Sequence, residues 1–247
     1  MLDDRTLSIL DKYWASHLGC QPEQLFAEPL HILTHGLQLA DYNGVFALFR
    51  DGGGVVSIPP DRSETLRRLL SGLMHDGSPA RLASALSSVA AEIIGEAYLG
   101  HATQVSQPRL HPVRELGPAD TAALSALQAA CGERDWEHGG VSGERPASGS
   151  FANGELVAVA SYEDWAGTIA HICVITHPDF RSRGFGRSAV AHLSERAIRV
   201  GLLPQYRTLE SNRGSMRIAE VLGFQRYATS IAVRLQPQLQ AARSGHL

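Results

Sequence analysis

The segment HPDFRSRGFGRS (His177–Ser188) lies between two apolar stretches of different periodicity. The stretch before it ends in Val174–Thr176 and is typical of a buried strand. The stretch after it has apolar residues three or four positions apart and stops at Gly201, as expected for a helix: Val190, Leu193, Ala197 and Val200. The sequence therefore predicts a strand, a glycine-containing turn and a helix, in that order.

The turn has the chemistry of a phosphate-binding loop. Gly184 and Gly186 allow the main chain to approach a ligand closely, and the free N–H groups at the start of a helix attract anions. Arg181, Arg183 and Arg187 add positive charge. The third glycine of GxGxxG is missing, and there is no GxxxxGK pattern, so two other phosphate-binding motifs are excluded.

Charge is distributed unevenly along the chain. Between His171 and Arg234 there are ten arginines and four acidic residues, a local net charge of +6, whereas the whole chain carries −3. A bound polyanion and a solvated helix face rich in arginine both account for this pattern. Because the overall charge is negative and no recognition motif is present, we expect no nucleic-acid partner.

Length and composition describe an ordinary globular protein. The 247 residues are 44% hydrophobic, 19% charged and 6% aromatic. Charged residues interrupt every apolar stretch before it reaches the length of a membrane span, and the first residues do not resemble a signal peptide, so we expect a cytoplasmic protein. The three cysteines are far apart, which argues against disulfides and a metal site: Cys20, Cys131 and Cys173.

The chain is expected to form two domains. Residues 1–104 show a helical pattern, then two strands around the DGGG turn (Asp51–Gly54), then two further helical patterns, the second over Leu82–Ala97. The polar segment Gly100–Pro112 has no sustained periodicity and is the predicted linker. Residues 111–247 form the second predicted domain. Both domains are expected to be of the α/β class.

A second pattern follows the glycine turn. A predicted strand at Tyr206–Glu210 precedes Asn212, which is a good helix N-cap, and the next helix ends where Gly223 can adopt a left-handed conformation. An alternating strand follows through Leu235.

Together the two patterns resemble the GNAT acetyltransferase superfamily. Arg181-x-x-Gly184-x-Gly186 is similar to its motif A, (Gln/Arg)-x-x-Gly-x-(Gly/Ala), and four later residues are similar to its next module, N-x-x-(A/S)-x7-G-F: Asn212, Ser215, Gly223 and Phe224. The resemblance implies a GNAT fold, with a mixed sheet, in the C-terminal half. The smaller N-terminal domain has a vaguer likeness to a degenerate copy that lacks motif A, and its role is open.

The resemblance also implies acetyl-CoA as cosubstrate and no metal. In this family the pantetheine arm pairs with main-chain groups at the end of the fourth strand, and the pyrophosphate is held by the motif A turn. The implied cofactor-binding residues are Val174, Ile175, Thr176, Arg181, Ser182, Arg183, Gly184, Phe185, Gly186, Arg187, Ser188, Asn212 and Ser215.

The implied reaction is transfer of an acetyl group to a primary amine of a small molecule or peptide, by direct attack on the thioester. Such chemistry calls for a base and an acid. The tyrosine that often serves as the acid in this family is replaced by Ala219. Tyr206 or Tyr227 could substitute, or solvent or main-chain donors could assist the thiolate.

Four residues are candidates for the base: His171, Glu137, His138 and Glu210. His171 could instead be a core histidine hydrogen-bonded to its neighbours. Glu210 could instead form a salt bridge with an arginine. Trp136, Glu137 and His138 lie in a predicted polar loop and are candidates for acceptor binding. The absence of the tyrosine also leaves a second function open, a catalytically impaired CoA-binding module for regulation or protein interaction. A homodimer is compatible with either function.

Overall fold

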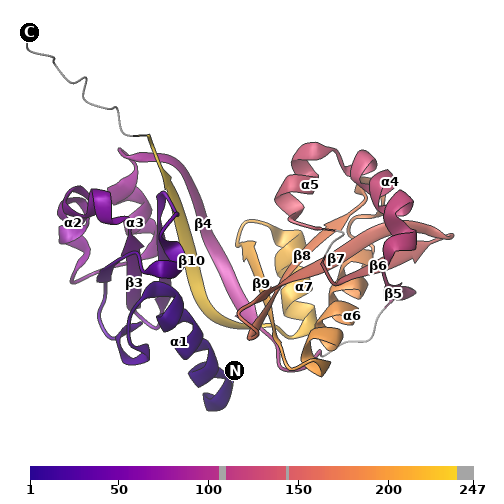
Figure 1. Ribbon diagram of the computed structural model, residues 1–247, viewed down its shortest axis with the longest axis horizontal. Helices are drawn as coiled ribbons and strands as arrows, with labels where there is room; N and C mark the ends of the chain where they lie inside the picture. Colours follow the sequence, from indigo (N-terminus) through magenta and orange to yellow (C-terminus); the bar gives the residue numbers. More distant parts are fainter. Residues whose placement is uncertain (106–109, 143–144, 238–247) are drawn as a thin grey trace, which may run out of the picture. The chain divides into compact units, whose positions relative to one another are not determined.

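The computed structural model describes residues 1–105, 110–142 and 145–237. These residues form two compact units. Unit 1 combines Met1–Leu7 with Ala97–Ala228, and unit 2 combines Ser8–Glu96 with the chain from Thr229 onward. Figure 1 shows the helices and strands, with labels where there is room. Within the described ranges, no helix is both long and apolar enough to cross a membrane.

Unit 1 contains a mixed sheet with the order β4-β9-β8-β7-β6-β5. β8 and β9 run parallel, and the other neighbouring strands run antiparallel. The strands are β4 (Ala90–His101, which enters unit 1 at Ala97), β5 (Val113–Glu115), β6 (Ala147–Ala152), β7 (Glu155–Trp165), β8 (Ile169–Thr176) and β9 (Leu203–Leu209). The predicted α/β class with a mixed sheet is confirmed.

Helices cover both faces of this sheet, because strand side chains alternate between the faces. α6 and α7 pack on the face that carries Ile172, whereas α4 and α5 pack on the face that carries Ile175 (Figure 1). We call the second of these the α4–α5 face. The helices are α4 (Thr121–Cys131), α5 (Glu133–Gly139), α6 (Phe185–Arg199) and α7 (Arg213–Leu222).

The strands of unit 2 follow the order β1-β3-β2-β10-β4. β2 and β3 form the predicted hairpin, and its turn residues Asp51 and Gly52 have φ values of 52° and 84°, as a type I′ turn requires. The elements are α1 (Asp4–Leu18, which begins in unit 1), β1 (His31–Thr34), β2 (Gly44–Arg50), β3 (Gly53–Ile58), α2 (Ser63–Leu70), α3 (Pro79–Leu86) and β10 (Gln225–Leu235, which begins in unit 1).

Short 3₁₀ helices connect several of these elements. They lie at Pro22–Gln24, Leu37–Leu39, Pro60–Arg62, Ser71–Leu73, Pro118–Asp120 and Pro178–Phe180. Proline begins four of them, where its fixed φ suits the first helical position.

The helix predicted over Leu82–Ala97 is wrong beyond Leu86. α3 ends at Leu86, and the strand β4 begins at Ala90. Val89, Ile93 and Ala97 are four residues apart, a spacing that also places residues on one face of a strand. Pairing of β4 with β9 and β10 therefore overrides an ambiguous local pattern.

The compact units also divide the chain at places other than the predicted boundary between 104 and 111. The divisions fall after Glu96 and after Ala228, inside β4 and β10. Each of these long strands contributes one part to each unit, so a sequence-local linker does not mark the division. Residues 106–109 of the predicted linker lie outside the described residues.

An ion pair before α4 provides a test of this fold. The Asp120 carboxylate accepts hydrogen bonds from two guanidinium nitrogens of Arg114, at 2.8 and 2.6 Å, and from the backbone N–H of Gly117 at 2.9 Å. The bonds from Arg114, followed by the bond from Gly117, lower the pKa of Asp120 to about 2. The stabilisation is therefore fully present above pH 3.8, the ordinary pKa of an aspartate, and is lost as the pH falls through about 2.

We expect Asp120→Asn to lower the free energy of unfolding at pH 7, because the amide cannot form the charged pair. The difference from wild type should shrink between pH 4 and pH 2, measured by urea unfolding at each pH. A difference that stays constant over that range would contradict the assignment.

Candidate functional site

The parallel strands β8 and β9 stop pairing before either strand ends. Their register runs from Ile169 opposite Leu203 to Ile172 opposite Tyr206. β8 continues to Thr176 and β9 to Leu209. We call these two unpaired ends the β8–β9 fork. Among the described residues, the fork leaves main-chain groups of β8 on its β9 side without a strand partner, and the predicted pantetheine-binding residues Val174–Thr176 lie there.

The loop after β8 leads into a helix start with many free donors. Among the described residues, the six backbone N–H groups from Ser182 to Arg187 donate no hydrogen bond, and the series ends at Ser188, whose N–H donates to the carbonyl of Gly184 at 3.0 Å. The positive end of the helix dipole adds to these donors. The arrangement is suited to bind an anionic group such as a phosphate.

Both glycines of the turn are required by their surroundings. Gly184 is the N-cap of α6 and has a φ of 90°, a conformation that strains residues with a side chain. A Cβ atom on Gly186 would lie 2.6 Å from the Oγ1 of Thr176, so the glycine allows α6 to approach the end of β8. The predicted strand, turn and helix are therefore present. Gly184 lies at the start of the helix, and Gly186 lies where the helix approaches the strand end.

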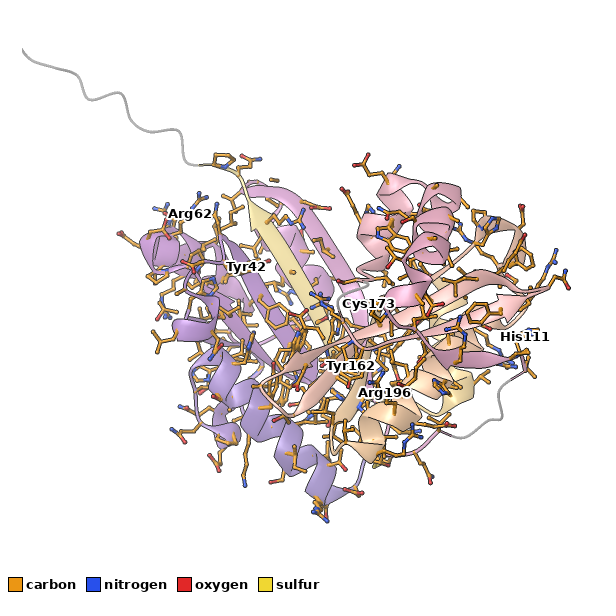
Figure 2. All side chains as sticks on the ribbon, turned by 45° about the vertical axis from the view of Figure 1, so that its right-hand side comes forward. Tyr42, Arg62, His111, Tyr162, Cys173 and Arg196 are labelled. Carbon is orange, nitrogen blue, oxygen red and sulfur yellow. The ribbon has the colours of Figure 1, made fainter. Side chains whose placement is uncertain are left out.

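The hydroxyl of Ser188 does not face the free donors. Its Oγ is buried and accepts hydrogen bonds from the backbone N–H groups of Leu110 and His111, at 3.0 and 3.3 Å. His111, labelled in Figure 2, also donates from Nε2 to the carbonyl of Arg183 at 2.7 Å and stacks on the ring of Phe185, with centroids 3.7 Å apart. His111 thus supports the turn. Sequence reasoning missed it, because it lies more than 70 residues away from its partners.

The three arginines of the turn have different surroundings. Arg181 donates from Nε to the carbonyl of Thr176 at 3.2 Å and forms an ion pair with Asp135 of α5 at 2.8 Å. Arg181 therefore connects α5 to the end of β8. The guanidinium of Arg183 lies over the Phe180 ring, and the buried Nε of Arg187 has no hydrogen-bond partner in the described part of the chain.

The polar loop predicted around Trp136 is wrong, because residues 133–139 form α5. Trp136 is partly buried among the core residues of the α4–α5 face, which fits a wall position. Glu137 and His138 are exposed, and the Nδ1 of His138 donates to the carbonyl of Arg134 in the same helix at 2.7 Å.

His171 lies on β8 one residue before Ile172, the last residue of β8 that pairs with β9. Its ring stacks on Trp165, with centroids 4.3 Å apart, and its Nδ1 is 2.9 Å from the Nε2 of Gln205 on β9. Burial, followed by the charges of Arg207 and Arg145, lowers the pKa of His171 to about 3. The imidazole is therefore neutral near pH 7.

Glu210 forms a salt bridge with Arg226 at 2.6 Å, the structural alternative foreseen for it. The predicted helix after it is present as α7. The Oδ1 of Asn212 accepts the backbone N–H of Ser215 at 3.1 Å, and Gly223 ends the helix with a φ of 82°. Ala219, where a tyrosine acid was expected, is fully buried.

Of the two candidate tyrosines, Tyr206 lies at the fork and Tyr227 does not. Tyr206 forms the last strand pair with Ile172, and its hydroxyl is hydrogen-bonded to Ser215. Burial raises the pKa of Tyr206 to about 12, so the phenol keeps its proton. Tyr227 packs edge-on against His101, with centroids 5.8 Å apart. In the ranges that the structure covers, no cluster of His, Cys, Asp or Glu side chains is arranged to hold a metal ion.

Comparisons with solved structures identify the fold. An acetyltransferase of the GNAT family from Colwellia psychrerythraea superimposes on 96% of this chain and 98% of its own, with a TM-score of 0.54 at 13% identity. A GNAT-family protein from Novosphingobium aromaticivorans is 22% identical over 58% of this chain, which spans 65% of that protein, with a TM-score of 0.45. A Salmonella typhimurium protein whose structure contains its cofactor acetyl-CoA is 21% identical over 52% of this chain and 95% of its own, with a TM-score of 0.36.

The comparison by sequence is narrower. No curated protein matches the chain. Residues 149–230 match the family model described as GNAT acetyltransferase, and this range contains the fork, the free N–H groups and α7. The resemblance to the GNAT superfamily of acetyltransferases that was seen in the sequence is thereby confirmed for residues 149–230.

Proposed function

We propose that this protein is an N-acetyltransferase that moves the acetyl group of acetyl-CoA to an amine of a small molecule or peptide. The observation that carries the proposal is the series of six free N–H groups at the start of α6, beside the β8–β9 fork. Both features lie in the segment that matches the acetyltransferase family. The local excess of arginine supports an anionic donor substrate.

The residues present fit coenzyme A. The N–H groups of 182–187 would hold the pyrophosphate, with Arg183 and Arg187 supplying charge, while Arg181 stays engaged with Asp135. Main-chain groups of Val174–Thr176 at the fork would pair with the pantetheine arm. Ser188 would support the turn indirectly, because its hydroxyl accepts hydrogen bonds from the backbone N–H groups of Leu110 and His111.

The reaction balances without a metal or a redox partner. An amine that has lost its ammonium proton to solvent attacks the thioester carbon, so that a C–N bond forms and the C–S bond breaks. The surplus proton on the nitrogen goes to the leaving sulfur, which gives an amide and the free thiol of CoA. The acceptor would approach from the α4–α5 face, where α5 presents Trp136, Glu137 and His138.

We assign the hydrogen bond to the leaving sulfur to Tyr206, in place of the tyrosine absent at Ala219. Three observations support the assignment: Tyr206 lies at the fork, its hydroxyl is held by Ser215, and its high pKa keeps the proton available for donation. Glu210 is held by Arg226, and this ion pair leaves it poorly suited to act as the base.

The cofactor site is tested with Gly184→Val and the matched control Gly201→Val. Both glycines have positive φ, 90° and 84°, and they flank opposite ends of α6. Each variant should therefore lose roughly 1–2 kcal/mol of stability from backbone strain. Only Gly184→Val should weaken acetyl-CoA binding, by about 100-fold or more, because its side chain lies at the free N–H groups.

Binding is measured by titration calorimetry and stability by urea unfolding. Wild-type affinity for acetyl-CoA in Gly184→Val would show that the cofactor binds elsewhere. Equal loss of binding in both variants would attribute the effect to α6 as a whole and would contradict the placement at its start.

The role of Tyr206 is tested with Tyr206→Phe, with Tyr227→Phe as the control. Release of free CoA from acetyl-CoA is followed over a panel of small amines, polyamines and peptides. We expect Tyr206→Phe to lower kcat about 10- to 100-fold with little change in KM for acetyl-CoA, because the donor acts on the departing sulfur. Tyr227→Phe should leave kcat near wild type.

If acetyl-CoA binds tightly and no amine is acetylated, the enzymatic proposal fails. A CoA-binding module with a regulatory role would then be the better description of the protein.

A further inference from the structure

His171 has an ordered environment on three sides. In the sheet register it faces Glu163 on β7 and Gln205 on β9, and Trp165 stacks on its ring. Its side chain is only partly buried, and the alternation along β8 places it on the same face as Ile175, the α4–α5 face. A single hydrogen bond, between Nδ1 and the Gln205 amide at 2.9 Å, determines which ring nitrogen can carry the proton.

The orientation of the Gln205 amide follows from its burial. Gln205 is fully buried, its Nε2 points at His171, and its Oε1 accepts no hydrogen bond from any described residue. If the amide were rotated by 180°, its oxygen would face His171 and its NH₂ group would have no acceptor. An unsatisfied carbonyl with two lone pairs is tolerated more often than buried N–H donors without partners, so the observed orientation is the favoured one.

We propose that Gln205 is a positioning residue that holds His171 as a neutral imidazole with its proton on Nε2, so that His171 acts as a hydrogen-bond donor to the reacting carbonyl. The inference rests on the proposed acetyl transfer. Because Gln205 donates to Nδ1, that nitrogen keeps its lone pair and Nε2 bears the hydrogen. This role replaces the base role suggested by the sequence.

The charges around His171 favour the uncharged state. On β7, Glu163 is already paired with Arg145, at 3.3 Å, and Arg207 follows Gln205 on β9. Beyond Gln205 in the sheet lies His101 on β4, which is fully buried, and burial lowers its pKa to about 3. On β8 itself, Cys173 lies two residues after His171 and is labelled in Figure 2. Burial raises the pKa of its thiol. These surroundings carry one more positive than negative charge.

A neutral donor suits the reaction better than a base at this position. When the amine adds to the thioester, the carbonyl π electrons move to oxygen, and a fixed N–H stabilises that negative charge until the C–S bond breaks. His171 keeps its proton throughout. An imidazole whose conjugate acid has a pKa of about 3 is too weak to deprotonate an alkyl ammonium group.

The tautomer is measured directly in ¹⁵N-labelled protein by long-range ¹H–¹⁵N correlation of the histidine rings. The wild type should show His171 with a proton on Nε2 and no charge at pH 5. In Gln205→Glu the carboxylate accepts from Nδ1, so the proton should move to that nitrogen and the ring should titrate at higher pH. A proton on Nδ1 in the wild type would overturn the proposal, whether or not an acceptor amine has been found.

Kinetics separates the donor from a base. If His171 is a donor, Gln205→Glu should lower kcat about 10-fold or more at a pH above the raised pKa of the ring, where Nε2 carries no proton, with little change in KM for acetyl-CoA. A base made stronger by the carboxylate would instead keep or raise kcat. The control Gln128→Glu adds the same charge at an exposed position of α4 and should leave kcat unchanged.

A second pair of variants covers the case in which Gln205→Glu fails to fold. His171→Gln keeps an N–H donor without a basic ring, and His171→Ala removes both. We expect His171→Ala to lower kcat about 100-fold and His171→Gln to recover at least about a tenth of wild-type kcat. Equal loss in the two variants would contradict the donor role, while normal acetyl-CoA binding in both would leave the proposed function in place.

Discussion

Backbone pairing between β8 and β9 ends at Ile172 and Tyr206, and the arrangement of the candidate site follows from that ending. Parallel strands have their carboxyl ends at the same edge of a sheet, so the turn before α6 and the cap of α7 meet at the fork. The fork itself exposes main-chain groups of β8. The small size of Gly186 then sets how closely the free donors of α6 approach the strand end at Thr176.

Electrostatics divides this site into a charged rim and a neutral interior. At the rim, Arg181 is paired with Asp135, and Glu210 with Arg226. Inside, burial keeps the imidazole of His171 uncharged, and it likewise keeps the phenol of Tyr206 protonated. The proposed chemistry therefore depends on neutral hydrogen-bond donors in fixed positions, with charge reserved for binding an anionic substrate.

The parts of the fold that could be predicted are those with local signals. The hairpin of β2 and β3 follows from its glycine turn, and α7 follows from the cap at Asn212 and the left-handed Gly223. Predictions failed where the local pattern was ambiguous. The spacing through Val89 and Ile93 suits a helix and a strand alike, and the polar segment around Trp136 forms a helix whose Trp136 packs on the core of the α4–α5 face. Contacts with residues distant in the chain decided both cases.

The sequence by itself determined the glycine-containing turn, the capped helix after it and the resemblance to the GNAT superfamily, because each depends on residues close together in the chain. Only the tertiary structure revealed that His111 supports the turn, that Gln205 is hydrogen-bonded to His171, and that the salt bridge foreseen as an alternative for Glu210 is formed with Arg226. These contacts join residues 16 to 72 positions apart. Hydrogen bonds and charges act over a few ångströms in space, and only the folded chain brings such residues within that distance.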